Sequence, residues 1–236
     1  NAMIDAATRD KLIVALDLSS YDDARALVDR LGDTVSFYKI GLELLFSDGL
    51  DLARELKNDG KRVFLDLKFL DIGNTVERAV ANAAALDIDF TTVHGHDTKT
   101  LKAAVKGRAG SNLKLLAVTV LTSLDQFDLD EQGIAATPAG LVVGRARMAE
   151  MAGFDGVIAS GQEAAAVRAE TGPDFLIVTP GIRLPGADAG DQTRVTTPEE
   201  AIGFGANHIV VGRPINAAKD PKAAAEAFLE HIASAR

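Results

Sequence analysis

The stretch Phe64-Leu-Asp-Leu-Lys-Phe-Leu-Asp-Ile-Gly-Asn-Thr75 joins the end of an apolar, β-type run to the start of a helical pattern. Three charged residues, Asp66, Lys68 and Asp71, fall close together at this junction. The pattern predicts a strand over Arg62–Leu67, with the charges at its end and on the loop that follows. A lysine between two carboxylates there stays protonated and keeps both carboxylates ionised. A surface salt-bridge cluster is the simpler interpretation of such a match, and a functional site is the alternative. The rest of the sequence is needed to choose between these two interpretations.

The same order, a short apolar run and then an amphipathic helical stretch, occurs eight times along the chain. The predicted strands are Lys11–Leu16, Val35–Ile40, Arg62–Leu67, Ile88–His94, Leu113–Val120, Gly156–Ser160, Phe175–Thr179 and His208–Gly212. This alternation predicts a parallel sheet closed into a (β/α)8 TIM barrel, with residues 3–236 as a single domain. An open doubly wound sheet is the alternative, but Ala15-Leu-Asp-Leu-Ser-Ser20 lacks the glycines of a dinucleotide-binding turn.

Helix starts between these strands can be assigned from capping residues. Ser19 or Ser20 can cap a helix that runs to Leu31, and Asn74 can cap the helix after the opening stretch. Thr197 precedes Pro198, which predicts another helix start.

Composition narrows the class of protein. The 236 residues are 47% hydrophobic and 25% charged, enough to bury a full core, and no run is long and apolar enough to suggest a membrane span. The net charge of -9 argues against a nucleic-acid partner. The absence of cysteine excludes disulfides and thiolate chemistry and is typical of a cytoplasmic protein. Asn1-Ala2 before Met3 resembles the remnant of an expression tag, at residues 1–2.

The carboxyl ends of the strands of such a barrel share one site, and they are rich in chemistry in this chain. The first predicted strand ends near Asp17, the second near Lys39, and the third near Asp66 and Lys68. Two pairs of opposite charge therefore converge at adjacent strand ends. The fifth runs into Thr119-Val-Leu-Thr-Ser123, whose hydroxyl groups suit polar recognition or simply form a turn.

The last two strands end in patterns that suit a phosphate group. These are Thr179-Pro-Gly-Ile-Arg183 and Val211-Gly-Arg-Pro-Ile215, with backbone N–H groups near Gly212 and the guanidinium of Arg213 as candidate ligands. The segment 183–197, which carries Gln192, is long and polar enough to be a lid, or else a tolerated surface insertion. His94 and His96 invite a metal-binding interpretation, but no third ligand is evident.

These motifs together resemble the orotidine 5'-monophosphate decarboxylase family over essentially the whole chain. The matching segments are Ile13-Val-Ala-Leu-Asp17, Phe37-Tyr-Lys-Ile-Gly41, Phe64 to Ile72 with Asn74-Thr75, Val118 to Ser123, Pro180-Gly-Ile-Arg183, Gly190-Asp-Gln192 and Val210-Val-Gly-Arg-Pro214. The family often has His-Asp-Ile-Pro where this chain has Leu70-Asp71-Ile72-Gly73. This departure bears on the loop conformation and leaves the charged residues intact.

The resemblance implies a role for each matching residue. It implies decarboxylation of orotidine 5'-monophosphate to uridine 5'-monophosphate without a metal or cofactor. Lys68 would protonate carbon 6, Asp66 would lie beside the scissile carboxylate, and Lys39 would belong to the same array. The resemblance further implies a homodimer in which Asp71 and Thr75 reach the partner's site. The substrate-binding residues that it implies are Asp17 for ribose, Thr122 and Ser123 for the pyrimidine, and Gln192, Gly212 and Arg213 for phosphate, with Arg183 on the same phosphate-side loop. Lys39 and Thr75 would also contact the substrate.

Two other functions fit the same scaffold. A magnesium-dependent decarboxylase or aldolase for sugar phosphates is similar around the D-x-K-x-x-D pattern, but Lys39 would repel a divalent cation where those relatives have a glutamate. A binding protein that has lost catalysis is the other alternative, although every charged catalytic position is present.

Overall fold

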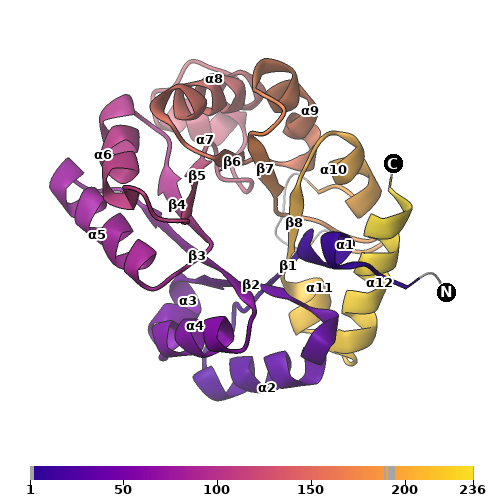
Figure 1. Ribbon diagram of the computed structural model, residues 1–236. Coiled ribbons are helices and arrows are strands. Elements are labelled where there is room, and N and C mark those ends of the chain that lie inside the picture. Colours follow the sequence, from indigo (N-terminus) through magenta and orange to yellow (C-terminus); the bar gives the residue numbers. More distant parts are fainter. Residues whose placement is uncertain (1–2, 189, 191–194, 236) are drawn as a thin grey trace.

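The computed structural model describes residues 3–188, 190 and 195–235, and its strands form a closed barrel in the order β1 to β8. The strands are β1 Leu12–Ala15, β2 Phe37–Gly41, β3 Arg62–Phe69, β4 Phe90–His94, β5 Lys114–Val118, β6 Gly156–Ile158, β7 Leu176–Thr179 and β8 His208–Val211. Every neighbouring pair is parallel, and β1 closes the barrel by pairing with β8 (Figure 1). The predicted (β/α)8 TIM barrel is confirmed.

Helices surround the barrel and connect its strands (Figure 1). They are α1 Ala6–Asp10, α2 Tyr21–Leu31, α3 Leu42–Leu45, α4 Gly49–Asn58, α5 Gly73–Ala85, α6 Thr98–Arg108, α7 Gln126–Glu131, α8 Pro138–Ala152, α9 Gly161–Glu170, α10 Pro198–Gly203, α11 Arg213–Asn216 and α12 Pro221–Ser234, with a 3-10 turn at Gly32–Thr34. In the part of the chain that the structure describes, no helix has the length and apolar character needed to cross a membrane. The proposed tag remnant, residues 1–2, lies outside that part.

Two apolar layers hold the barrel together. The inner layer is one buried cluster inside the barrel, made of Ile13, Ala15, Phe37, Phe64, Phe90, Leu116, Val178 and Val210. The outer layer lies between strands and helices and includes Leu12 and Val14. Because side chains alternate across a strand, one strand such as β1 supplies both layers, which explains its continuous apolar sequence.

The amino-terminal end of the barrel is filled by aromatic rings and a guanidinium group. Arg62 lies 4.5 Å from the ring centroid of Phe37 and 5.3 Å from that of Phe90, where a cation is attracted by the faces of the rings. The same guanidinium donates to the carboxylate of Asp10 at 2.7 and 2.9 Å. Because these side chains fill the amino-terminal end, a ligand-binding site can form only at the carboxyl end of the barrel.

The local predictions were partly right. Ser20 caps α2 by accepting from Asp23 N, and Thr197 caps α10 by accepting from Glu200 N, as expected. Asn74 was wrongly assigned as a cap, because α5 already begins at Gly73 and Asn74 lies in its first turn.

Two elements also differ from their expected extents. The strand predicted to end at Leu67 continues to Phe69, with an irregular register against β4 between Leu65 and Phe69. The helix α7 lies in an acidic stretch between β5 and α8, for which no helix was predicted, and Asp125 and Asp128 form a capping box at its start.

Candidate active site

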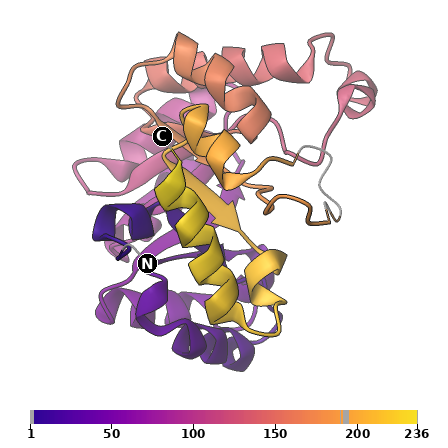
Figure 2. The same cartoon turned by 90° about the vertical axis from the view of Figure 1, so that its right-hand side faces the viewer.

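A cavity of about 530 Å³ lies at the carboxyl end of the barrel. Residues from the ends of β1, β2, β3, β5, β6, β7 and β8 line it, so its walls come from nearly the whole chain. Its charged and polar lining residues are Asp17, Lys39, Glu43, Asp66, Lys68, Thr122, Ser123, Arg183, Arg213 and Asn216. In Figure 2 the orange chain after β7 protrudes on the right, at the end of the barrel opposite the indigo N-terminal helix. The volume is that of a small-molecule site.

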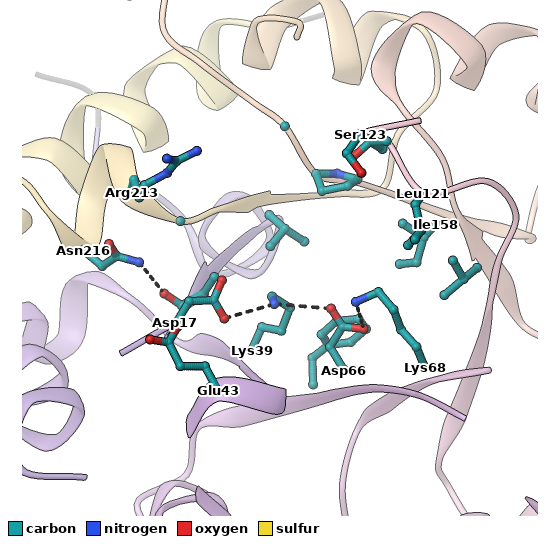
Figure 3. A pocket seen from close by; sticks show the side chains of 18 of the residues that line it. Asp17, Lys39, Glu43, Asp66, Lys68, Leu121, Ser123, Ile158, Arg213 and Asn216 are labelled. Atoms are coloured by element: carbon teal, nitrogen blue, oxygen red, sulfur yellow. Dashed lines mark hydrogen bonds and ion pairs between the residues drawn. The ribbon is translucent and has the colours of Figure 1, made fainter. Parts of the chain in front are cut away.

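Four of these side chains form a row of alternating charge on one side of the cavity (Figure 3). Lys39 Nζ lies 3.5 Å from Asp17 Oδ1 and 3.3 Å from Asp66 Oδ2. Lys68 Nζ lies 2.9 Å from the other oxygen of Asp66, Oδ1. The strand ends of β1, β2 and β3 therefore bring Asp17, Lys39, Asp66 and Lys68 together, as the sequence predicted. These four residues are called the charged array below.

Asp66 is the centre of the charged array. It is 8% exposed, and besides the two lysines it accepts a hydrogen bond of 2.7 Å from Thr92 Oγ1. Thr92 in turn accepts from the backbone N–H of Lys68 at 3.1 Å, so one hydroxyl holds both the carboxylate and the chain that carries the ammonium. The array is therefore built to keep a fixed geometry.

Opposite charges decide the protonation states in this array. Burial alone would raise the pKa of Asp66, but the charges of Lys39 and Lys68 and the hydrogen bonds outweigh it, so the pKa is lowered. Burial would likewise lower the pKa of Lys39, but the charges of Asp66 and Asp17 outweigh it, so this pKa is raised. Asp66 and Lys39 are therefore both ionised at neutral pH, and a neutral ligand group in the cavity meets a strong local field.

The backbone at Lys68 is unusual. Its φ is 48°, in the left-handed region that a side-chain-bearing residue rarely adopts, and it lies within the irregular part of β3. Such conformations cost of order 1 kcal/mol or more and cluster at functional sites, where the surrounding structure imposes them. In Figure 3 the side chain of Lys68 points toward Asp66. The irregularity accounts for the strand extending past its predicted end.

Two guanidinium groups meet at another wall of the cavity. A Cβ atom placed on Gly190 would lie 2.9 Å from Arg213 Nη2 and 3.7 Å from Arg183 Nη2, so both arginines approach this glycine. The φ of Gly190 is +66°, which also favours glycine. Arg183 comes from the chain after β7 and Arg213 begins α11 after β8. These loops are where barrels commonly bind phosphate.

The other predicted site residues fall into three groups. Thr122, Ser123 and Gly212 line the cavity, as expected. Asp71 and Thr75 are exposed and do not line it, and Asp71 instead accepts a hydrogen bond from Ile72 N at 2.7 Å. The expectation that two carboxylates of the opening stretch flank Lys68 was therefore wrong within one chain. Gln192 lies outside the described residues, as do residues 189, 191, 193 and 194 of the segment predicted to be a lid.

Sequence reasoning missed three polar residues of this site. Thr92 is one of two adjacent threonines in β4, so its contact with Asp66 has no sequence signal. Glu43 lines the cavity and accepts from Ser19 Oγ at 2.8 Å. Asn216 also lines it and donates to the backbone oxygen of Ala15 at 3.1 Å, which ties α11 to β1. The only sequence signal for these three residues was the position of Asn216, one helical turn after Gly212 and therefore near the predicted phosphate site.

Two histidines, His94 at the end of β4 and His96 after it, lie close to the charged array. The rings of His94 and His96 are 4.8 Å apart, and no group of three or more metal-ligating side chains occurs among the described residues. Burial, with the positive charges of Lys68 and Arg145 and the neighbouring His96, lowers the pKa of His94 to about 4. His94 is therefore neutral at pH 7.

Exposed apolar side chains border the same end of the barrel. They are Leu42 and Phe46, around α3, and Leu70 and Ile72, between β3 and α5, and they are called the apolar rim below. Phe46 is 89% and Ile72 is 73% exposed. Exposed apolar groups gathered in this way mark interaction surfaces more often than isolated ones do.

Comparisons with known proteins agree with this geometry. Residues 10–228 match the model of the "Orotidine 5'-phosphate decarboxylase / HUMPS family". The chain is 52% identical over 235 residues to an orotidine 5'-phosphate decarboxylase from Rhodopseudomonas palustris strain HaA2, covering 100% of both chains. It is 55% identical to one from Methylobacterium sp. strain 4-46, covering 96% of this chain and 97% of that protein. The crystal structure of the Lactobacillus acidophilus orotidine 5'-phosphate decarboxylase superposes with a TM-score of 0.81 at 41% identity, covering 94% of this chain and 98% of the other.

Proposed function

The chain belongs to the orotidine 5'-phosphate decarboxylase / HUMPS family, and on that premise we propose that it is a carboxy-lyase that converts orotidine 5'-monophosphate to uridine 5'-monophosphate. The proposal includes a reaction without metal or cofactor, with Lys68 as the proton donor to carbon 6. The observation that carries it is the charged array, in which the ammonium of Lys68 lies 2.9 Å from a buried carboxylate at the wall of a nucleotide-sized cavity.

The chemistry requires a stabilised negative charge at carbon 6. When carbon dioxide leaves, the electron pair of the broken carbon–carbon bond remains on that carbon in an orbital that is not conjugated with the ring. An ammonium fixed beside it is favourable only as this charge develops, and so lowers the transition state more than the ground state. The carboxylate of Asp66, itself held by Lys39 and Thr92, fixes that ammonium beside the cavity.

Lys68 also supplies the proton. Its N–H bond breaks as the new carbon–hydrogen bond forms, which leaves a neutral amine beside the ionised Asp66. The side chain of Lys68 is 33% exposed, so water can return the proton after the product leaves. Two ammonium groups around Asp66 also oppose a divalent cation, which is the physical argument for a metal-free reaction.

The remaining wall residues suit the rest of the nucleotide. Arg183 and Arg213 would bind the phosphate, since a guanidinium offers paired donors to its oxygens. Gly212 and Gln192 would join them, Asp17 would bind ribose hydroxyls, and Thr122 and Ser123 would face the pyrimidine. Phosphate contacts far from carbon 6 would orient the ring over Lys68.

The test of this function is a decarboxylation assay in a chelator. Orotidine 5'-monophosphate is mixed with the protein in buffer that contains a chelating agent, and the loss of orotate absorbance is followed. We expect rapid conversion to uridine 5'-monophosphate at the same rate with and without chelator. Activity that disappears in chelator would support the magnesium-dependent alternative. Tight nucleotide binding without conversion would support a binding protein.

We also propose that the site is completed by a second copy of the chain. Asp71 and Thr75 are exposed near the cavity rather than within it, and the apolar rim lies beside Asp71. A symmetric dimer that buries the apolar rim would bring Asp71 of one copy toward Lys68 of the other. Lys68 would then lie between two carboxylates, one from each chain.

A mixing experiment tests this shared site. Lys68→Ala and Asp71→Ala are each expected to be nearly inactive alone, but an equimolar mixture refolded together should regain about a quarter of the wild-type activity, because about half of its dimers are mixed and each mixed dimer has one intact site of two. Activity is measured after the two variants are unfolded and refolded together. If each site used Asp71 from its own chain, both sites of a mixed dimer would be defective and no activity would return. Variants refolded separately and then combined serve as the control.

A further inference from the structure

The end of the segment 183–197 is fixed to the start of α9 by close packing. Thr196 is 5% exposed and lies against Gly161, the first residue of α9. A Cβ atom on Gly161 would lie 2.1 Å from Thr196 Cγ2 and 2.9 Å from Thr196 Cβ, distances at which real Cβ atoms are not found. The φ of Gly161 is not in the left-handed region, so its backbone would accept any residue. Glycine is therefore needed at position 161 only because Thr196 occupies the space that a side chain would fill.

Thr196 cannot easily turn away from an added atom. It is β-branched, which restricts its side-chain rotamers, and its Oγ1 donates to Glu200 Oε2 at 3.0 Å. Gln162 Nε2 also donates to the backbone oxygen of the preceding residue, Val195, at 3.4 Å. The start of α9 therefore holds the chain at residues 195–196 from two sides.

Thr196 in turn holds the residue that faces the phosphate side of the cavity. Its backbone oxygen accepts from the N–H of Arg183 at 3.0 Å, and Ile182 and Thr196 form an isolated parallel bridge. Arg183 lines the cavity and shares the surroundings of Gly190 with Arg213. We infer that Gly161 and Thr196 are positioning residues, which set the place of Arg183 and hence the affinity for the 5'-phosphate of the ligand. The kinetic part of this inference rests on the proposed function.

The primary test is Gly161→Ala, with Gly144→Ala as the matched control, because a Cβ on Gly144 in α8 would meet nothing within 4 Å. We expect Gly161→Ala to raise KM for orotidine 5'-monophosphate about tenfold with kcat changed less than about twofold, because overpacking displaces a binding group and not the charged array. The dissociation constant of uridine, which has no phosphate, should stay unchanged. Gly144→Ala should match the wild type in all three.

Rescue separates positioning from a general loss of structure. Thr196→Ser keeps the hydroxyl and removes Cγ2, the atom closest to the added methyl group. Gly161→Ala combined with Thr196→Ser should therefore recover part of the lost affinity, because Cβ of residue 196 still lies 2.9 Å from the added atom. Thr196→Ser alone should stay close to the wild type. If Gly161→Ala does not fold, Thr196→Ala replaces it as the test, because it adds no atoms. Thr196→Ala should also raise KM, by less than about tenfold.

A readout independent of catalysis is tryptic cleavage after Arg183. We expect cleavage about tenfold faster in Gly161→Ala than in the wild type, with the rate partly restored in the double variant. This rate reports on the anchor whether or not the protein decarboxylates anything, so failure of the proposed function is distinguished from failure of the inference. The inference is overturned if trypsin cleaves Gly161→Ala at the same rate as Gly144→Ala and the two variants bind the nucleotide equally well. It is also overturned if kcat of Gly161→Ala falls by as large a factor as its KM rises.

Discussion

Turnover of orotidine 5'-monophosphate should fall by about 10⁴-fold or more when Lys68 is replaced by alanine, since both a proton donor and a preorganised charge are lost. Binding of uridine 5'-monophosphate should persist, because the arginines near Gly190 and the hydroxyls of Thr122 and Ser123 are untouched. The measurement is absorbance loss under saturating substrate together with the dissociation constant of the product. A variant with near-normal turnover would exclude Lys68 as the proton donor.

Two further variants make this result specific. Lys68→Arg retains a positive charge, but a guanidinium does not release its proton in proteins, so this variant separates charge from proton transfer. We expect the turnover of Lys68→Arg also to be severely reduced, because no proton can be donated. The reduction should be smaller than in Lys68→Ala to the extent that the positive charge itself stabilises the transition state. Lys106→Ala removes a surface lysine whose side chain is 76% exposed, and it should behave like the wild type.

Replacing Asp66 by asparagine should reduce both turnover and stability. The change keeps the size of the side chain but leaves the ammonium groups of Lys39 and Lys68 without the carboxylate that lies 3.3 and 2.9 Å from them. Removing one partner from a buried charge network is expected to lower the free energy of unfolding by about 3 kcal/mol. Turnover should fall about 10²-fold to 10³-fold, because Lys68 loses the group that fixes its position.

The stability part of this prediction has a defined pH range. The lowered pKa of Asp66 means that its stabilisation is present above the unfolded-state pKa of about 3.9 and is lost as the pH falls through the folded-state value. The raised pKa of Lys39 means that its contribution is complete below about pH 10.4 and is lost as the pH rises through the folded-state value. The difference between wild type and Asp66→Asn should therefore be nearly constant near neutral pH and shrink in acid.

Denaturant unfolding of three proteins measures the effect. Asp17→Asn is the matched control for stability, because Asp17 is 45% exposed and lies 3.5 Å from Lys39, so the change should cost less than about 1 kcal/mol. If Asp66→Asn unfolds at the same or a higher denaturant concentration than the wild type, the cost of burying these charges exceeds the gain from pairing them.

The fold was predictable because each strand is a local signal. All eight predicted strands are present, and their bounds shift by a few residues at most, since apolar runs mark burial better than they mark strand ends. The error at β3 has a physical cause. A regular strand would end where the charges begin, but the left-handed backbone of Lys68 lets the pairing continue to Phe69.

The site was predictable to the extent that strand ends in a barrel converge. That rule brings Asp17, Lys39, Asp66 and Lys68 together, and it also places Arg213 and Gly212 at the cavity. It does not reveal contacts between segments distant in the sequence. The hydrogen bond from Thr92 to Asp66 and the packing of Thr196 on Gly161 depend on side-chain positions that no local pattern encodes.

Closure of the barrel by β1 and β8 also bears on how the protein is made. The cavity takes residues from Ala15 to Asn216, and β1 has no partner on one side until β8 has been synthesised. A ribosome-bound chain that ends before β8 lacks Gly212, Arg213 and the partner of β1, so the barrel cannot close and the cavity cannot form. Synthesis must therefore pass β8 and α11 before the nascent polypeptide can acquire its pocket.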